Sequence, residues 1–184
     1  MKFHKIDLQT WKRRECFEHY VSSIPCTYSL TVKLDITKIR EKNLRLYPTM
    51  LYCITKVVNR HPELRTAYNA QGELGIYEEM NPSYAIFHKE SESFSLLWTE
   101  FTDDYRSFCT SYEKDLQTYG QGEGMIAKPH MPENCIDVSM IPWASFTGRG
   151  TRPSCPLPCR YNMGYATDSM PPALSGSFKP WSTR

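Results

Sequence analysis

The sequence YPTMLYCITKVV at residues 47–58, followed by LRTAYNAQGELGIY at residues 64–77, decides the fold class. Apolar residues recur at nearly every 3.6 positions of the first stretch, which predicts an amphipathic helix with Pro48 in its first turn. They are Met50, Leu51, Ile54, Val57 and Val58. In the second stretch a turn at Asn69–Gly72 separates two strand-like runs, which predicts a hairpin.

Periodic patterns outside this pair predict further helices and strands. The clearest strand pattern is the alternation from Tyr28 to Ile36, which indicates a half-buried strand. The other predicted elements are an edge strand at Lys2–Asp7, a short helix at Arg13–Val21, strands at Tyr84–His88, Ser93–Trp98 and Ile136–Ile141, and a helix from Thr102–Asp104 to Gly120. We therefore expect an α/β two-layer sandwich with a mixed β-sheet.

The composition changes near residues 146–148. Residues 148–184 contain no isoleucine or valine but six of the 13 prolines, whereas residues 1–147 contain 15 isoleucines and valines. A segment without β-branched apolar residues and rich in proline is poorly suited to core strands or helices. We predict a folded body at 1–147 and a disordered tail at 148–184.

Charge and hydropathy exclude several classes of protein. The net charge of +2 and the pI near 8.1 are too balanced for a protein that binds nucleic acid through its phosphates. No run approaches the roughly 18 apolar residues of a membrane span, and the first residues do not resemble a signal peptide. With no secretory signal, the seven cysteines predict reduced thiols and a cytoplasmic location.

General catalytic and metal-binding motifs add little. The sequence has no glycine-rich phosphate loop, no His-Glu-x-x-His and no nucleophile elbow. Cys155 and Cys159 form one Cys-x₃-Cys pair without a second pair, so we predict no metal site. A redox or metal protein using these two cysteines is the most distant alternative.

A series of ordered blocks resembles the trimeric type of chloramphenicol acetyltransferase, and the match extends over residues 1–147. The blocks are WKRRECFEHY at 11–20, IPCTYSL at 24–30, YP at 47–48, VNR at 58–60, ELRTA at 63–67, FHKESESFS at 87–95, PEN at 132–134 and VSMIPW at 138–143. The resemblance implies a mixed sheet with helices on one side and a homotrimer with its sites at subunit interfaces. The implied reaction is acetyl transfer from acetyl-CoA, as co-substrate, to the 3-hydroxyl of chloramphenicol, which confers antibiotic resistance.

The resemblance also implies roles for individual residues. Ser139 matches the serine whose hydroxyl stabilises the tetrahedral intermediate, and Arg13 matches an arginine that pairs with an aspartate near the catalytic histidine. The side chains that match the lining of the antibiotic pocket are Tyr20, Ile24, Cys26, Tyr28, Phe87 and Phe94. No metal is implied.

The sequence departs from the family pattern after about residue 147. The family base is a histidine in a C-terminal His-His-x-x-x-Asp-Gly block, and no histidine follows His130 in this sequence. We therefore expect a truncated acetyltransferase body, with little activity in this chain. A non-catalytic product, or an inactive subunit of a family trimer, is the alternative. A reading-frame change and a fusion to an unrelated sequence both stay open as origins of the tail.

Overall fold

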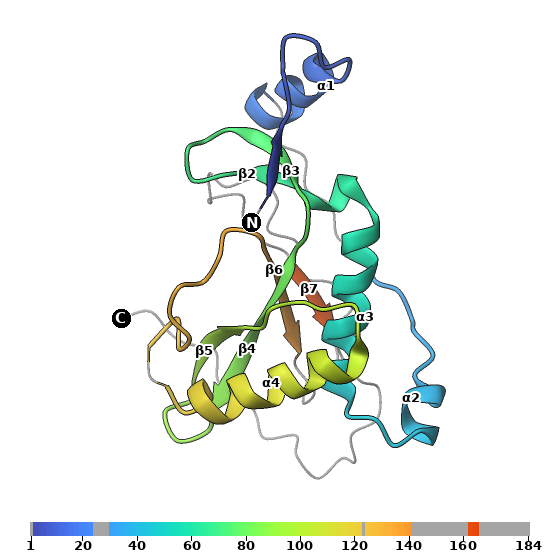
Figure 1. Cartoon of the computed structure of the whole chain (residues 1–184), viewed down its shortest axis with the longest axis vertical. Coiled ribbons are helices and arrows are strands. Elements are labelled where there is room, and N and C mark those ends of the chain that lie inside the picture. Colours follow the sequence, from blue (N-terminus) through green and yellow to red (C-terminus); the bar gives the residue numbers. More distant parts are fainter. Residues whose placement is uncertain (1, 24–29, 123, 141–161, 166–184) are drawn as a thin grey trace.

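The computed structural model describes residues 2–23, 30–122, 124–140 and 162–165 of the 184-residue chain, the last of these as backbone only. Its elements follow in the order β1 (Phe3–Lys5), α1 (Arg14–Glu18), a π-helical turn (His19–Ser23), α2 (Thr37–Glu41), α3 (Leu46–Arg60), a 3₁₀ turn (Pro62–Arg65), β2 (Thr66–Tyr68), β3 (Leu74–Tyr77), β4 (Asn81–His88), β5 (Ser93–Trp98), α4 (Tyr105–Tyr119), β6 (Cys135–Met140) and β7 (Asn162–Tyr165). The ribbon in Figure 1 shows their arrangement.

The strands form two sheets. A three-stranded antiparallel sheet has the order β1-β3-β2, so β1 lies at an edge as the sequence predicts. A four-stranded sheet has the order β5-β4-β6-β7, in which β4 and β5 are antiparallel while β6 runs parallel to both of its neighbours. The mixed sheet predicted from the sequence is confirmed.

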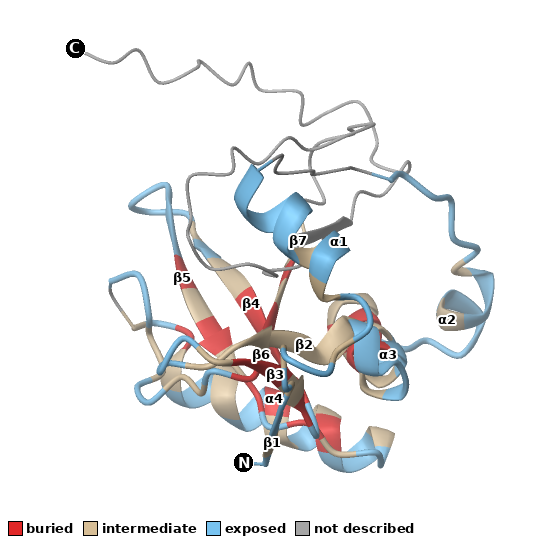
Figure 2. Cartoon of the chain, turned by 90° about the horizontal axis from the view of Figure 1, so that it is seen from above, coloured by how far each residue is buried: buried red, intermediate tan, exposed pale blue. Residues whose placement is uncertain are grey.

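Two long helices, α3 and α4, pack against one face of the four-stranded sheet. Tyr84 of β4 lies between them, with its ring 6.0 Å from that of Tyr47 on α3 and 5.2 Å from that of Tyr112 on α4. The fully buried side chains of Leu51, Leu97 and Phe108 belong to the same core. Most buried residues in Figure 2 lie on the strands and on these two helices, which agrees with an α/β arrangement of a mixed sheet and helices.

Local sequence signals place the ends of these helices. Pro48 lies in the first turn of α3, and α3 ends before His61, whose extended backbone leads into Pro62. Asp104 caps α4 by accepting a hydrogen bond from the Ser107 amide at 2.7 Å. The predicted helices at both places are therefore confirmed.

The predicted strand at Tyr28–Ile36 is wrong over the part that the structure describes. Residues 30–36 belong to no strand, and the apolar side chains of Leu30, Val32 and Leu34 are 77%, 63% and 56% exposed. Alternation shows which side chains a strand would bury, but a strand also needs a neighbouring backbone and a surface to cover. Neither is supplied to this segment by the described residues. Tyr28 itself lies outside them.

The segment predicted to be a tail contains one described element. Strand β7 pairs in parallel with β6, with Ser139 opposite Gly164. The other residues of 148–184 lie outside the described part of the chain, so the division at residue 147 stays a prediction.

Candidate active site

The strand register places three of the predicted site residues on one face of the four-stranded sheet. Side chains alternate between faces, and Tyr84, Leu97 and Val138 point toward α3 and α4. The opposite face, called here the distal face, carries Ala85, Phe87, Phe94, Asp137 and Ser139. Residues from the consecutive strands β4 and β5 and from the later strand β6 therefore share one surface.

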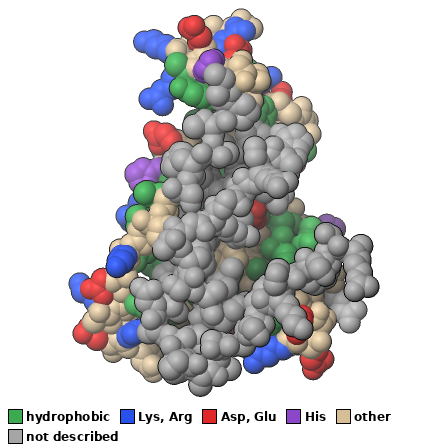
Figure 3. Space-filling model, turned by 180° about the vertical axis from the view of Figure 1, so that it is seen from behind, with side chains coloured by type: hydrophobic (Ala, Val, Ile, Leu, Met, Phe, Trp, Pro, Cys, Tyr) green, Lys and Arg blue, Asp and Glu red, His purple; other side chains and the backbone are tan. Residues whose placement is uncertain are grey.

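Phe87 and Phe94 form the aromatic part of the distal face. They lie directly opposite each other in the antiparallel pair of β4 and β5, and they are 46% and 51% exposed. Directly opposed residues have Cβ atoms about 5 Å apart, so the two rings present one apolar surface. Hydrophobic side chains also gather on the side of the molecule away from α4, as Figure 3 shows. Such a surface suits an aryl ligand.

Ser139 lies one residue beyond the Tyr84–Val138 pair in β6 and is half-buried. The peptide group before Ser139 is anchored from the helix side of the sheet. The Tyr47 hydroxyl donates a hydrogen bond shared between the carbonyl oxygens of Ala85, at 3.2 Å, and Val138, at 3.4 Å. Burial raises the pKa of Tyr47 far above its ordinary value, so this hydroxyl stays a donor. None of the hydrogen bonds between described side chains engages Ser139 Oγ, which leaves the hydroxyl able to donate to a ligand.

A buried polar network lies behind the sheet and was not predicted from the sequence. The Tyr84 hydroxyl, Thr99, Asp115 and Lys128 form a chain of hydrogen bonds in which each link is 2.8 Å long. The ammonium of Lys128 also lies 3.9 Å from the centre of the Trp98 ring. This network ties α4 and the loop before β6 to the central strands.

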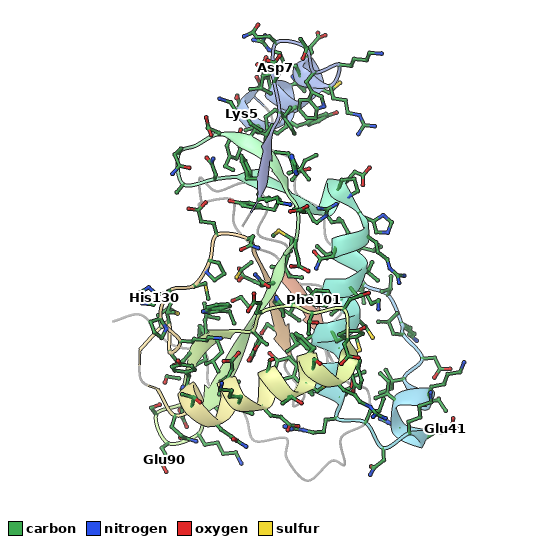
Figure 4. All side chains as sticks on the ribbon, viewed as in Figure 1. Lys5, Asp7, Glu41, Glu90, Phe101 and His130 are labelled. Atoms are coloured by element: carbon green, nitrogen blue, oxygen red, sulfur yellow. The ribbon has the colours of Figure 1, made fainter. Side chains whose placement is uncertain are left out.

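None of the five histidines lies on the distal face, although all five fall within the described residues. The His88 ring points toward the helices, with Nε2 2.9 Å from Oγ of the buried Ser95. His130 is exposed on the loop before β6, as Figure 4 shows. His4 belongs to the other sheet, and His19 and His61 are exposed at helix ends. Within this one chain, no imidazole from the described residues faces Ser139.

The remaining predicted site residues lie elsewhere. Tyr20, 55% exposed, is in the π-helical turn after α1, at the opposite end of Figure 1 from the β4–β5 turn. Arg13 is exposed just before α1, and no described carboxylate forms an ion pair with it. Ile24, Cys26 and Tyr28 lie outside the described residues. The structure therefore brings together Ser139, Phe87 and Phe94 but does not add the N-terminal residues to them.

The described part of the chain offers neither a cluster of metal ligands nor a membrane-spanning helix. The described residues contain no group of three or more histidine, cysteine or acidic side chains placed to hold a metal, and Cys155 and Cys159 lie outside them. No helix in the described part of the chain is long and apolar enough to cross a membrane.

Comparison with known proteins decides the family. The family model for chloramphenicol acetyltransferase matches residues 1–151. The chain belongs to this family. A chloramphenicol acetyltransferase of Clostridium perfringens is 58% identical over 148 residues, which cover 80% of this chain and 72% of the relative.

Other chloramphenicol acetyltransferases match the same part of the chain. The protein of Campylobacter coli is 53% identical over 148 residues, covering 72% of its length, and that of Staphylococcus aureus is 40% identical over 151 residues, covering 70%. Each match covers 80% of this chain. A solved chloramphenicol acetyltransferase structure superposes with a TM-score of 0.68 at 18% identity, covering 82% of this chain and 75% of that one. The expected family and fold are therefore confirmed, and the family is one of acyltransferases.

Proposed function

We propose that the distal face is the chloramphenicol side of an acetyltransferase site that uses acetyl-CoA as its co-substrate. The observation that carries the proposal is the shared face of Ser139, Phe87 and Phe94 in a chain of this family. Phe87 and Phe94 contact the apolar parts of the drug. Aromatic side chains suit this role, because pockets for small molecules are lined mainly by hydrophobic and aromatic groups. Tyr20 completes the pocket from another subunit of a homotrimer, which agrees with the separation of the π-helical turn from the β4–β5 turn in Figure 1. Ile24, Cys26 and Tyr28 are assigned to the same pocket on the resemblance alone.

Ser139 acts on the acyl group. When the drug's 3-hydroxyl attacks the thioester carbonyl, the carbonyl oxygen becomes negatively charged, and a hydroxyl that donates to it lowers the barrier. Ser139 Oγ has no hydrogen bond to a described side chain, and this and the support of the neighbouring Val138 carbonyl by Tyr47 favour this role. The reaction needs no metal in this scheme. We assign the protein to the cytoplasm, where both substrates are present, and assign it no nucleic-acid or membrane partner.

We further propose that this chain is impaired in the proton-transfer step. A base must accept the proton of the attacking hydroxyl, and loss of general-base assistance typically removes about 10²–10⁴ in rate. The five histidines at positions 4, 19, 61, 88 and 130 all lie away from the distal face, and residues 131–184 contain none. Arg13, exposed and without an ion pair among the described residues, fits the loss of its aspartate partner.

The second candidate is a non-catalytic product, or an inactive subunit within a family trimer. The exposure of Phe87 and Phe94 favours it, because an incomplete pocket leaves apolar side chains in water. Its origin is testable in the coding sequence after Thr147. A His-His-x-x-x-Asp-Gly block in a shifted frame would indicate a reading-frame change, and its absence from all frames would indicate a fusion.

Equilibrium binding of chloramphenicol separates the two candidates. We expect saturable binding that the substitution Phe94→Ala weakens roughly tenfold or more, because the drug loses one apolar wall. Val57→Ala is the matched control, since Val57 is also 51% exposed but lies on α3. Equal affinity of the two variants would contradict the proposed pocket. The absence of saturable binding would favour the non-catalytic candidate.

A further inference from the structure

Residues 124–127, called here the edge segment, follow α4 and add a short edge to the four-stranded sheet. The Leu96 amide of β5 donates to the Met125 carbonyl at 2.8 Å, and the Ala127 amide donates to the Leu96 carbonyl at 3.0 Å. These bonds form a parallel bridge between Leu96 and Ile126, so both side chains project to the same face. Leu96 lies on the distal face by its register with β4, and Ile126 therefore extends that face beyond β5.

Ser95 holds the edge segment from the other face of the sheet. Neighbouring strand residues project to opposite faces, and Ser95, 1% exposed, lies on the helix face of β5. Its hydroxyl donates to the carbonyl oxygens of Gly124 at 2.6 Å and Gly122 at 3.1 Å. Gly124 has a φ of 91°, a conformation that suits glycine because it has no Cβ to clash with the backbone.

His88 completes this cluster from β4. Its Nε2 lies 2.9 Å from Ser95 Oγ. A serine hydroxyl carries one proton, which the glycine carbonyls receive, so His88 donates this bond and Ser95 accepts it. The Ser95 hydroxyl is therefore fixed in direction, because it is donor and acceptor at once. Replacing it by a methyl group would leave the carbonyls of Gly122 and Gly124 and the ring N–H without this partner.

The edge segment is held at both ends although two of its side chains are exposed. Lys128, the next residue, forms the nearly buried ion pair with Asp115 at 2.8 Å. Between this pair and the bond to Ser95, Met125 and Ile126 are 61% and 52% exposed. Apolar side chains in water on an anchored backbone are expected of a binding surface, because a fixed surface loses less conformational entropy when a ligand binds.

We propose that Ser95 and His88 are positioning residues for the drug-binding surface. They act through the Gly124 carbonyl, which holds the edge segment so that Ile126 lies beside Leu96 and continues the apolar surface of the distal face. Neither contacts the drug, because both side chains lie on the helix face. This role rests on the proposed function, but the anchoring of the edge segment can be measured without any ligand.

Hydrogen exchange of the full chain, resolved to single amides, tests the anchoring. We expect Ser95→Ala to speed exchange of the Ala127 amide roughly tenfold or more, because the edge segment opens more often. The amide of Phe101, which donates to a side chain of β4 at 2.8 Å, is the internal control and should not change. Ser93→Ala is the matched variant, since Ser93 lies on the same face of β5 but bonds to Ser91 in the β4–β5 turn.

The donor role of His88 is tested in the same way. His88→Gln keeps an N–H that can reach Ser95 and should retain most of the protection of the Ala127 amide, whereas His88→Leu should lose it roughly tenfold. Unchanged exchange of Ala127 in both Ser95→Ala and His88→Leu would overturn the proposal. Equal acceleration at Phe101 would also overturn it, because the variants would then loosen the whole fold.

Equilibrium binding of chloramphenicol tests the consequence for the site. We expect Ser95→Ala to weaken binding about fivefold or more and Ser93→Ala to leave it unchanged. Unchanged affinity in a Ser95→Ala chain whose Ala127 amide has lost its protection would overturn the positioning role. Absence of binding by the unsubstituted chain would overturn the proposed function and this role with it, which the exchange measurement, made without drug, distinguishes from a failure of the anchoring alone.

Discussion

The two faces of the four-stranded sheet differ in how their side chains are used. On the helix face, Tyr84 is fully buried between α3 and α4, and its hydroxyl begins a chain of hydrogen bonds to Asp115 and Lys128. On the distal face, Phe87 and Phe94 are about half exposed and Ser139 Oγ has no bond to a described side chain. The comparison indicates that one face stabilises the fold, while the other carries the residues to which we assign ligand binding.

The largest expected effect is on the helix face. Tyr84→Ala removes a fully buried ring between two others, and we expect it to lower the free energy of unfolding by about 3–5 kcal/mol. Phe94→Ala, on the distal face of the neighbouring strand, should cost less than about 1 kcal/mol because its ring is already half in water. Urea denaturation followed by circular dichroism measures both. Similar losses for the two variants would remove the distinction between the faces.

A smaller loss is expected from the ion pair behind the sheet. Asp115 and Lys128 are 13% and 15% exposed, so Asp115→Asn leaves a nearly buried ammonium without its counter-charge and should cost about 3 kcal/mol. Glu113, on the same helix as Asp115, pairs with Arg45 at the start of α3, and both side chains are at least half exposed, so Glu113→Gln should cost less than about 1 kcal/mol. Chemical denaturation at neutral pH compares the two. Equal losses would show that burial of the Asp115 pair contributes nothing.

The smallest expected effect depends on pH. Burial, together with the hydrogen bond to Glu133, raises the pKa of Tyr77 to about 12, above its unfolded value near 10. The protonated form is therefore favoured in the folded state, and its contribution is complete below pH about 10 and is lost as the pH rises toward 12. Tyr77→Phe should be about 1 kcal/mol less stable near neutral pH, with a smaller alkaline decline.

Unfolding measured near neutral pH and at pH about 11 tests this sign. A gap between the unsubstituted chain and Tyr77→Phe that widens with pH would contradict the assignment. Spectrophotometric titration of the tyrosines should also lose one transition near pH 12 in the variant.

Local sequence patterns predict much of the helix face. Pro48 and Asp104 mark the starts of α3 and α4, and the strand-like runs at Tyr84–His88 and Ser93–Trp98 predict β4 and β5. These elements find their partners within the body, so local patterns are sufficient. The strand predicted at Tyr28–Ile36 fails over residues 30–36 because no described strand pairs with it.

Only part of the candidate site can be predicted from the sequence. The resemblance singles out Ser139, Phe87 and Phe94, but their common face depends on the parallel pairing of β4 with β6, which no local pattern reveals. The ion pair between Asp115 and Lys128 joins α4 to the loop before β6. The two residues are 13 positions apart, and charged residues at that spacing give no periodic pattern in the sequence. Tertiary packing brings both sets together.

The rate of chloramphenicol acetylation by the purified chain, measured from the coenzyme A thiol released, tests the central claim most directly. Assayed beside the 58% identical enzyme of Clostridium perfringens, the chain should be at least about 10²-fold slower, because no histidine among the described residues faces Ser139 and the aromatic surface. A rate equal to that of the relative, abolished by Ser139→Ala but unchanged by Ser91→Ala in the β4–β5 turn, would contradict the account.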